Sequence, residues 1–307
     1  MIINTRMYEE VLHNVSEGIR FVSLMGQTFF WNRGAEAIAG FKSDEMVGAV
    51  CEALHLVRDE GEESVCSFLC PLKWTKDENR IGDIRVYLRH SEGHLVPVIM
   101  NAVSLLDDRG EKIGIAEIFK PVSWSEKKTG SQEKASEDTL VDRLTGVCNQ
   151  KHAEHTLKGK VEEFRRYGTR FGLAVIDVDD LGEINGKYGR EVGDAMLKVI
   201  SRSLSSTLRP FDTICRWDSD EFIIFASNIR NDQNLMNMSN RIRLLVQESS
   251  LSHKGDKLNS TVSVGASIVR QNEDEEQLLT RTRGLMKQSK SLGKNIVTMG
   301  RDFIGSK

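Results

Sequence analysis

A polar segment near the middle of the chain decides how the rest can fold. From Pro121 to Leu140 the sequence reads PVSWSEKKTGSQEKASEDTL, with few apolar side chains and no apolar periodicity. Because such a segment has too little apolar surface to join a core, it is predicted to be a linker. The 307 residues also exceed the usual length of one domain. We therefore expect one domain over residues 1–120, a linker over 121–140 and a second domain over 141–307.

Short apolar runs separated by turn residues fill the first of these domains. In the run IRVYLRH, which begins at Ile84, apolar and more polar side chains alternate. This period of two predicts a strand with one buried face. Two runs precede a helical region from Asn32 to about Leu56, and three follow it, separated by turns at 91–93 and 107–110. The pattern predicts an antiparallel sheet with helices across one face.

The segment FFWNRGAEAIAGFKSDEMVG, at residues 29–48, carries a family resemblance. A strand that ends in Trp-Asn leads into a short helix, a Gly-aromatic step and a second helix, and in this respect the segment resembles the PAS family. The resemblance extends over roughly residues 8–120. It implies a sensor domain, but it leaves the ligand or signal open, because PAS domains bind different ligands or none.

Five cysteines at uneven spacing favour thiols or metal ligands over a disulfide framework. Three of them and a histidine fall between the helices and the third strand of the PAS-like region. These candidate sensor ligands are Cys51, His55, Cys66 and Cys70. Their Cys-x₃-His and Cys-x₃-Cys spacings suit zinc, iron–sulfur or haem iron, and the same spacing also suits one buried helix face. Cys148 and Cys215 lie in the second domain and are expected to be structural.

Charge and hydropathy exclude several classes of partner. The formal net charge is −3, with acids and bases interspersed, so no basic field is expected to attract nucleic acid or an anionic membrane. The first residues lack the pattern of a signal peptide, and no apolar stretch is long enough to cross a bilayer. The sequence therefore predicts a soluble cytoplasmic protein.

Strand-like and helical patterns alternate through residues 141–300. The strands are predicted at FGLAVIDV, TICRW, EFIIFAS, TVSVGASIV and IVTMG, with long helical stretches between most of them. Such alternation is typical of an α/β layer in which helices pack on a central sheet.

Two pairs of acids stand beside these strands. Asp177 and Asp179 end the first strand and share a face of it, and Asp220 with Glu221 follows the turn between the second and third strands. Acids at strand ends and turns are often only solvated. Two acidic pairs on neighbouring strands also suit Mg²⁺, which prefers carboxylate and phosphate oxygens.

Several ordered motifs identify the second domain as similar to the GGDEF family of diguanylate cyclases. They are DRLTGVCNQ at 142–150, IDVDDLGEINGKYGREVGDAML from 176, DSDEF at 218–222, TVSVGAS from 261 and KSLGKN from 290. The resemblance implies that two GTP molecules are condensed into cyclic di-GMP, in a homodimer whose two active sites face each other. The fold class expected for the whole chain is α/β (α+β), with a PAS antiparallel sheet followed by a GGDEF domain whose central sheet is surrounded by helices.

The same resemblance assigns roles to residues of this sequence. Metal ligands for Mg²⁺ or Mn²⁺ would be Asp177, the carbonyl of Val178 and Glu221, and Asp220 would lie by the attacking 3′-hydroxyl or share the metals. The substrate-binding residues would be Asn185 and Asp194 at the guanine edge and Lys290 and Lys294 at the triphosphate. An inhibitory R-x-x-D site for the cyclic product would use Arg209 and Asp212.

Several positions depart from the family pattern, and three of them bear on the substrate. Asp218 and Ser219 stand where the signature has glycines, and Gly182 stands where the family has lysine. Residues other than glycine at a hairpin turn are expected to cost about 1–2 kcal/mol where the turn needs positive φ. Side chains here can crowd the substrate, so two functions stay open: a sensor-controlled cyclase, or a degenerate domain that acts as a receptor for GTP or cyclic di-GMP. A cyclase that accepts ATP is disfavoured, because Asp194 suits guanine.

Overall fold

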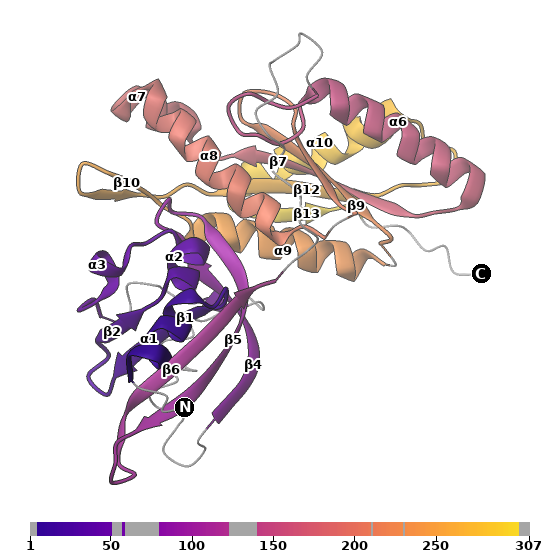
Figure 1. The fold of residues 1–307 in the computed structure, drawn as a ribbon. Coiled ribbons are helices and arrows are strands. Elements are labelled where there is room, and N and C mark those ends of the chain that lie inside the picture. The colour runs from indigo at the N-terminus through magenta and orange to yellow at the C-terminus, as the bar shows by residue number, and fades with distance from the viewer. Residues whose placement is uncertain are drawn as a thin grey trace. The chain divides into compact units, whose positions relative to one another are not determined.

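The computed structural model describes residues 5–50, 57–58, 80–122, 140–209, 211–229 and 231–300. The chain divides into two compact units, Met1–Ser123 and Trp124–Lys307 (Figure 1). Each unit combines a β-sheet with helices, so the expected mixed fold class is confirmed.

The N-terminal unit is built on an antiparallel sheet with the strand order β2-β1-β6-β5-β4-β3. Its strands are β1 (Gly18–Ser23), β2 (Thr28–Trp31), β3 (Val57–Arg58), β4 (Arg80–Arg89), β5 (Leu95–Leu106) and β6 (Lys112–Pro121). The one-faced burial expected for β4 is incomplete. Val86 and Leu88 are buried as predicted, and Tyr87, which points to the opposite face, is also fully buried. The sequence analysis did not foresee β3.

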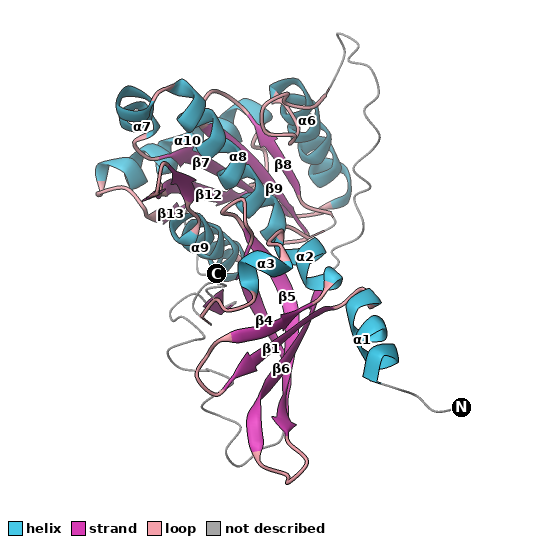
Figure 2. Ribbon diagram, turned by 60° about the vertical axis from the view of Figure 1, so that its left-hand side comes forward, coloured by secondary structure: helices cyan, strands magenta, loops and turns pink. Residues whose placement is uncertain are grey.

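Helices α1 (Thr5–Asn14), α2 (Arg33–Ala39) and α3 (Ser43–Met46) complete this unit, and Figure 2 shows α2 and α3 beside the sheet. Asn32 begins α2, because its side-chain oxygen accepts a hydrogen bond from the Ala35 N–H at 2.8 Å. Gly40, with φ of 74°, ends it. The apolar core between α2 and the sheet contains Trp31 and Phe119. The helix α1 was not predicted.

The C-terminal unit has a five-stranded sheet in the order β13-β12-β7-β9-β8. Its strands are β7 (Phe171–Val178), β8 (Thr213–Arg216), β9 (Glu221–Ser227), β12 (Val262–Ile268) and β13 (Val297–Met299). Only the β12–β13 pair is parallel. A separate hairpin of β10 (Leu251–His253) and β11 (Asp256–Leu258) was not expected from the sequence.

Helices cover both faces of this sheet, with α8 and α9 on one side and α6 and α10 on the other (Figure 1). The helices of the unit are α6 (Gln150–Tyr167), α7 (Leu181–Tyr188), α8 (Arg190–Thr207), α9 (Asp232–Glu248) and α10 (Glu275–Ser291). Among the helices that the structure describes, none has both the length and the apolar character needed to span a bilayer.

Candidate functional site

The two acidic pairs meet at one end of the sheet. Strands β7 and β9 run antiparallel, and their register places Asp177 directly opposite Glu221. Val178 donates its backbone N–H to the carbonyl of Asp220 at 3.0 Å, which extends the pairing into the turn. Residues opposite each other in an antiparallel pair share a face. The Asp177 and Glu221 side chains therefore lie together on one face at this end of the sheet.

Helix α10 supplies a cation to each of these carboxylates. Lys290 forms an ion pair with Asp177. Arg283 donates to Glu221 from two nitrogens, with Nη2 2.6 Å and Nε 3.0 Å from Oε1. The guanidinium of Arg283 also lies 4.9 Å from the ring centroid of Trp217. The site is thus a carboxylate pair clamped by two cations from one helix.

Gly265 explains how α10 comes so close to the sheet. A Cβ at this position on β12 would lie 2.2 Å from the backbone nitrogen of Met286 and 2.3 Å from the carbonyl oxygen of Thr282. Any side chain would push α10 away from β12. The glycine of the TVSVGAS motif therefore lets the helix bring Arg283 and Lys290 to the acids.

The electrostatics of Asp177 show that negative charge is crowded here. The pKa of Asp177 is raised to about 6. Burial is the largest cause, the Lys290 ion pair opposes it, and the charges of Asp220 and Glu221 add to it. Such a group of close carboxylates suits a divalent cation, because oxygen ligands and excess negative charge are what Mg²⁺ requires. The carboxylates of Asp177 and Glu221 and the carbonyl of Val178 thus fit a magnesium or manganese ion.

The second acid of the first pair has a structural role. Asp179 is buried and accepts hydrogen bonds from Thr261 Oγ1 at 2.6 Å, Ser263 Oγ at 2.7 Å and the Asn295 N–H at 3.1 Å. These bonds tie the end of β7 to β12 and to the KSLGKN loop.

The signature turn differs from expectation in its backbone. Neither Asp218 nor Ser219 is among the described residues with positive φ. The expected cost of replacing glycine is therefore absent, because the turn does not enter the left-handed region at these positions. Asp218 Oδ1 accepts from the Ser219 N–H at 2.7 Å, and Ser219 Oγ lies 3.1 Å from Asp220 Oδ1.

Arg216 holds this turn through hydrogen bonds to two of its carbonyl groups. Its Nη2 donates to the carbonyl of Ser219 at 2.6 Å and its Nε to the carbonyl of Asp218 at 3.2 Å, while Nη1 pairs with Asp142 at 3.2 Å. Burial alone would raise the pKa of Asp142, but hydrogen bonds from Thr145 and the charge of Arg216 lower it below its ordinary value. The DRLTG motif thus holds the arginine that shapes the signature turn.

The two residues assigned to guanine lie on consecutive helices. Asn185 is on α7, and its Oδ1 would lie 1.8 Å from a Cβ at Gly193, the residue before Asp194 on α8. The Asn185 side chain therefore occupies the space that Gly193 leaves open. Asn185 Oδ1 is buried and has no hydrogen-bond partner among the described residues. A buried acceptor without a donor fits a ligand that brings N–H groups.

Lys294 carries a cation near the start of α7, whereas Gly182 has no side chain that could reach a phosphate. Lys294 has a φ of 63° and forms an ion pair with Asp180, at the start of α7, rather than with the carboxylates of β7 and β9. No described atom lies within 4 Å of a Cβ built at Gly182. The missing lysine at position 182 thus leaves open space, and a longer side chain fits there.

The R-x-x-D residues form a tight turn before β8. Asp212 is buried, and its two carboxylate oxygens accept from the backbone N–H groups of Arg209 at 3.0 Å and Ser227 at 2.9 Å. Arg209 itself is exposed. Asp212 therefore holds the turn, and Arg209 is the member that faces solvent.

The remaining predicted residues are cysteines and His55. Cys51, His55, Cys66 and Cys70 lie outside the described residues. Cys148 pairs through its backbone with Cys215 of β8 in one parallel β-bridge, and both side chains are thiols. Cys215 is fully buried and Cys148 is partly buried against the core.

Two residues of the site were missed from the sequence. Arg216 was passed over because an arginine on a strand end has no distinctive pattern. Arg283 had a detectable signal, since it precedes Lys290 by seven residues, which is two helical turns, and so both lie on one face of α10.

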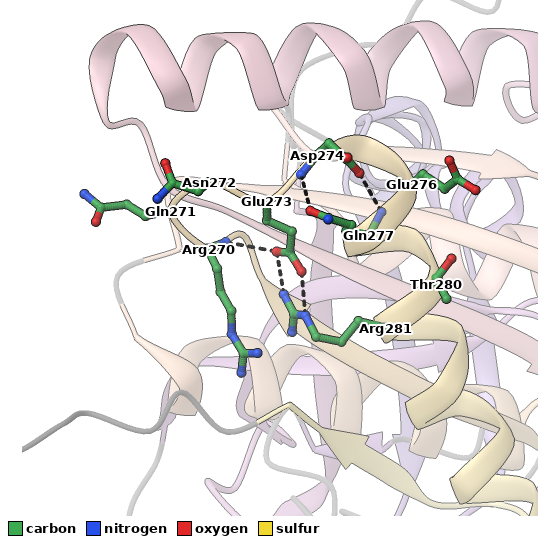
Figure 3. Close-up of a pocket in the computed structure, with 9 residues that line it drawn as sticks. All are labelled: Arg270, Gln271, Asn272, Glu273, Asp274, Glu276, Gln277, Thr280 and Arg281. Atoms are coloured by element: carbon green, nitrogen blue, oxygen red, sulfur yellow. Dashed lines mark hydrogen bonds and ion pairs between the residues drawn. The ribbon is translucent and has the colours of Figure 1, made fainter.

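An open hollow at the other end of β12 carries no site. Figure 3 shows the interactions among the residues around it, which centre on Glu273 with Arg281 and on Asp274 with Gln277. Glu273 pairs with Arg281 at 2.7 Å and accepts from the Arg270 N–H at 3.1 Å, while Asp274 and Gln277 cap α10 reciprocally. These groups satisfy each other, so they serve to begin the helix.

Comparison with known proteins agrees with this geometry. The sheet with an acidic hairpin and cations from α10 is that of an α/β nucleotide cyclase domain. The family model for the diguanylate cyclase GGDEF domain matches residues 139–296, which is more than half of the chain. The chain belongs to the GGDEF family of diguanylate cyclases.

Individual relatives are similar to part of this chain. The response regulator PleD of Caulobacter vibrioides is 28% identical over 216 residues, which covers 62% of this chain and 47% of PleD. The diguanylate cyclase DosC of Escherichia coli is 27% identical over 169 residues, covering 55% of this chain and 36% of DosC. The chain therefore spans half or less of the length of these relatives.

Solved structures show the same fold. The diguanylate cyclase SiaD of Pseudomonas aeruginosa, in complex with its activator SiaC, has a TM-score of 0.51 and 28% identity, with 53% of this chain and 63% of SiaD covered. The GGDEF domain of DgcB from Caulobacter crescentus, in complex with c-di-GMP, has a TM-score of 0.52 and 23% identity, with 54% and 98% covered. The second likeness concerns the fold alone.

Proposed function

We propose that the chain condenses two GTP molecules into cyclic di-GMP and pyrophosphate. The observation that carries this proposal is the register pair of Asp177 and Glu221, two carboxylates on one face that are matched by Lys290 and Arg283. The arrangement supplies oxygen ligands for a metal and cations for a triphosphate within one site.

Asp177, Glu221 and the carbonyl of Val178 would hold Mg²⁺ or Mn²⁺. When bound, such an ion would polarise the α-phosphate and favour ionisation of the attacking 3′-hydroxyl. Lys290 and Arg283 would turn from the carboxylates toward phosphate oxygens, and Lys294 would join them from the neighbouring loop. Asp220, between the turn and β9, would lie beside the 3′-hydroxyl or share the metals.

Guanine would bind between α7 and α8. The Asn185 and Asp194 side chains offer acceptors to the N1–H and N2–H₂ groups of guanine, and the buried oxygen of Asn185 supports this assignment. Because ring closure joins two nucleotides in two equivalent attacks, each chain would hold one GTP and two sites would face each other. The active form is therefore proposed to be a homodimer.

The second candidate function is a receptor that binds GTP or cyclic di-GMP without turnover. It is favoured by two observations: Asp218 places an exposed negative charge at the signature turn, and position 182 carries no cation. The described backbone favours the enzyme, because the turn is reached without left-handed residues at 218 and 219.

Incubation of the purified full chain with GTP and Mg²⁺, followed by nucleotide chromatography, decides between these functions. We expect the wild-type protein to form product and Asp218→Gly/Ser219→Gly to raise the rate modestly, by a few-fold, through loss of one negative charge. Gly182→Lys should also raise the rate, with an effect that weakens with salt.

A wild type that forms no product, together with activity in the glycine or lysine variants, would support the receptor function. If neither the wild type nor any variant forms product as a confirmed dimer, the enzyme hypothesis is refuted.

We propose that the R-x-x-D turn binds the cyclic product and inhibits the enzyme. Arg209→Ala is expected to weaken cyclic di-GMP binding at least about tenfold, because an arginine can bind a phosphate or a guanine edge through two donors. Its melting temperature should not change, since the Arg209 side chain is exposed. Asp212→Ala should lower both the affinity for cyclic di-GMP and the melting temperature, because Asp212 holds the turn.

Calorimetry measures these affinities, and Arg109→Ala, in the other unit, is the control. Equal affinities of the wild type and Arg209→Ala for cyclic di-GMP would contradict the assignment.

The N-terminal unit is proposed to be a PAS-like sensor that controls this activity in the cytoplasm. Its strand order and the helices beside the sheet support the assignment, together with the Trp-Asn step that begins α2. Cys51, His55, Cys66 and Cys70 stay candidate ligands for a metal, haem or redox signal.

A further inference from the structure

The hairpin between β4 and β5 gathers two histidines and a glutamate. His90 donates its backbone N–H to the carbonyl of His94 at 2.8 Å, so these two residues close the hairpin as a cross-strand pair. Their side chains therefore project from the same face. The two imidazole rings stack, with centroids 4.3 Å apart and planes 25° from parallel. Glu92 lies between them in sequence, at the tip of the turn.

One ligand atom from each of these three residues lies within 4.8 Å of the others. Glu92 Oε2 is 3.8 Å from His90 Nδ1. A metal with bonds of about 2.0–2.1 Å in tetrahedral geometry needs its ligand atoms about 3.3 Å apart. The site would therefore have to close by no more than about 1.5 Å, and Glu92, the exposed member at the tip of the turn, can supply such a movement by rotation of its side chain.

The lone pair of His90 Nδ1 points toward the turn. This atom accepts a hydrogen bond from the Glu92 backbone N–H at 3.1 Å, which places the proton of the neutral ring on Nε2. A cation bound by Nδ1 would take over this lone pair, beside the Glu92 carboxylate. The side chain of Glu92 is 51% exposed and that of His90 is 18% exposed, so a metal reaches the cluster from solvent.

The rest of the turn is firmly held. Gly93, with φ of 89°, donates its N–H to the His90 carbonyl at 2.8 Å, and Ser91 donates its N–H to the carbonyl of Ala39 at 2.9 Å. A Cβ at Gly40 would lie 2.5 Å from Cε1 of His90. The His90 ring therefore packs against the residue that ends α2.

We infer that His90, Glu92 and His94 form a binding site for a first-row transition-metal ion such as Zn²⁺, Ni²⁺ or Cu²⁺. Two imidazoles and one carboxylate are the ligands that these ions prefer, whereas Mg²⁺ prefers oxygen ligands alone. Three protein ligands leave positions for water or for a ligand of the sensor unit. The three ligands belong to the N-terminal unit and are none of the residues assigned to the cyclase, so the inference does not depend on the proposed function.

The test is a titration of the full chain with Co²⁺ or Zn²⁺ in saturating Mg²⁺, which occupies the oxygen sites. We expect His90→Gln/His94→Gln to lose one equivalent of bound metal relative to wild type. His13→Gln, a histidine of the same unit outside the cluster, is the matched control and should keep it. The variant Cys51→Ser/Cys66→Ser/Cys70→Ser should also keep this equivalent, with a Co²⁺ spectrum that lacks the intense thiolate charge-transfer band.

Glu92→Gln is the second variant, and it tests the metal site if the double histidine variant fails to fold. Because Glu92 is exposed at the turn, its replacement should leave the melting temperature of the metal-free protein unchanged and weaken metal binding about tenfold. If His90→Gln/His94→Gln folds and binds metal with the stoichiometry and affinity of the wild type, the inference is overturned. If only Glu92→Gln folds, the same result in that variant overturns it.

Discussion

Glu221→Gln is expected to abolish formation of cyclic dinucleotide while the protein stays folded. The Glu221 carboxylate lies opposite Asp177 and is the only member of the pair held by a guanidinium. An amide is a poor ligand for Mg²⁺, and removal of one charge-stabilising group from a preorganised site costs about 10²–10³ in turnover. Chromatography of nucleotides after incubation with GTP and Mg²⁺ measures the loss.

The matched control is Glu276→Gln, which changes an exposed glutamate in the first turns of α10 and should leave turnover at the wild-type level. Circular dichroism and the melting temperature establish that both variants are folded. If Glu221→Gln keeps the wild-type rate, Glu221 has no part in the reaction. That result would still count against the receptor function, because the protein would have turned over GTP.

Local patterns were sufficient to predict the sheet of the C-terminal unit. The runs FGLAVIDV and EFIIFAS coincide with β7 and β9, because both strands are buried on each side and are therefore continuously apolar. The β10–β11 hairpin escaped detection, since its short strands are mostly exposed and have no apolar pattern. Helix α1 was predictable and was missed, since Met7, Tyr8, Val11 and Leu12 have the spacing of one helix face.

The site was predictable where the motif fixes a strand position, and less so where a role depends on contacts. Asp177 and Glu221 were expected as a pair, and the register of β7 and β9 brings them together. The backbone at Asp218 could not be deduced from the family glycines, because a turn adjusts its φ values to the residues present. The seven-residue spacing shows that Arg283 shares a helix face with Lys290, but its contact with Glu221, 62 residues away in the sequence, has no local pattern.

Asp177→Asn is expected to have two opposite effects, on turnover and on stability. It should abolish cyclic dinucleotide formation, because it removes a proposed metal ligand. In the metal-free protein it should raise the melting temperature of the C-terminal unit at neutral pH. The reason is that burial and the neighbouring acids raise the pKa of Asp177 from 3.8 to about 6, so the ionised carboxylate is unfavourable in the folded state.

The sign of the pH dependence follows from that shift. A raised folded-state pKa means that the folded protein binds the proton more tightly, so the stabilisation is complete below about pH 4 and is lost as the pH rises through 6. A shift from 3.8 to about 6 corresponds to about 3 kcal/mol at most, and the expected gain for Asp177→Asn above pH 7 is about 1–3 kcal/mol. The gain should vanish at pH 4, where the wild-type carboxyl is largely protonated.

Calorimetric melting of the full chain in EDTA between pH 4 and 8 measures this difference, and added Mg²⁺ with GTP should reverse it. The ligands stabilise only the wild type by binding its folded state, so the wild type should then melt higher than the variant. Asp232→Asn, at the start of α9, is the control and should show no such dependence on ligand. If Asp177→Asn is instead less stable than the wild type in EDTA at pH 8, the Lys290 ion pair stabilises ionised Asp177 more than burial and the neighbouring acids destabilise it. Repulsion between the carboxylates would then not favour the binding of a divalent cation.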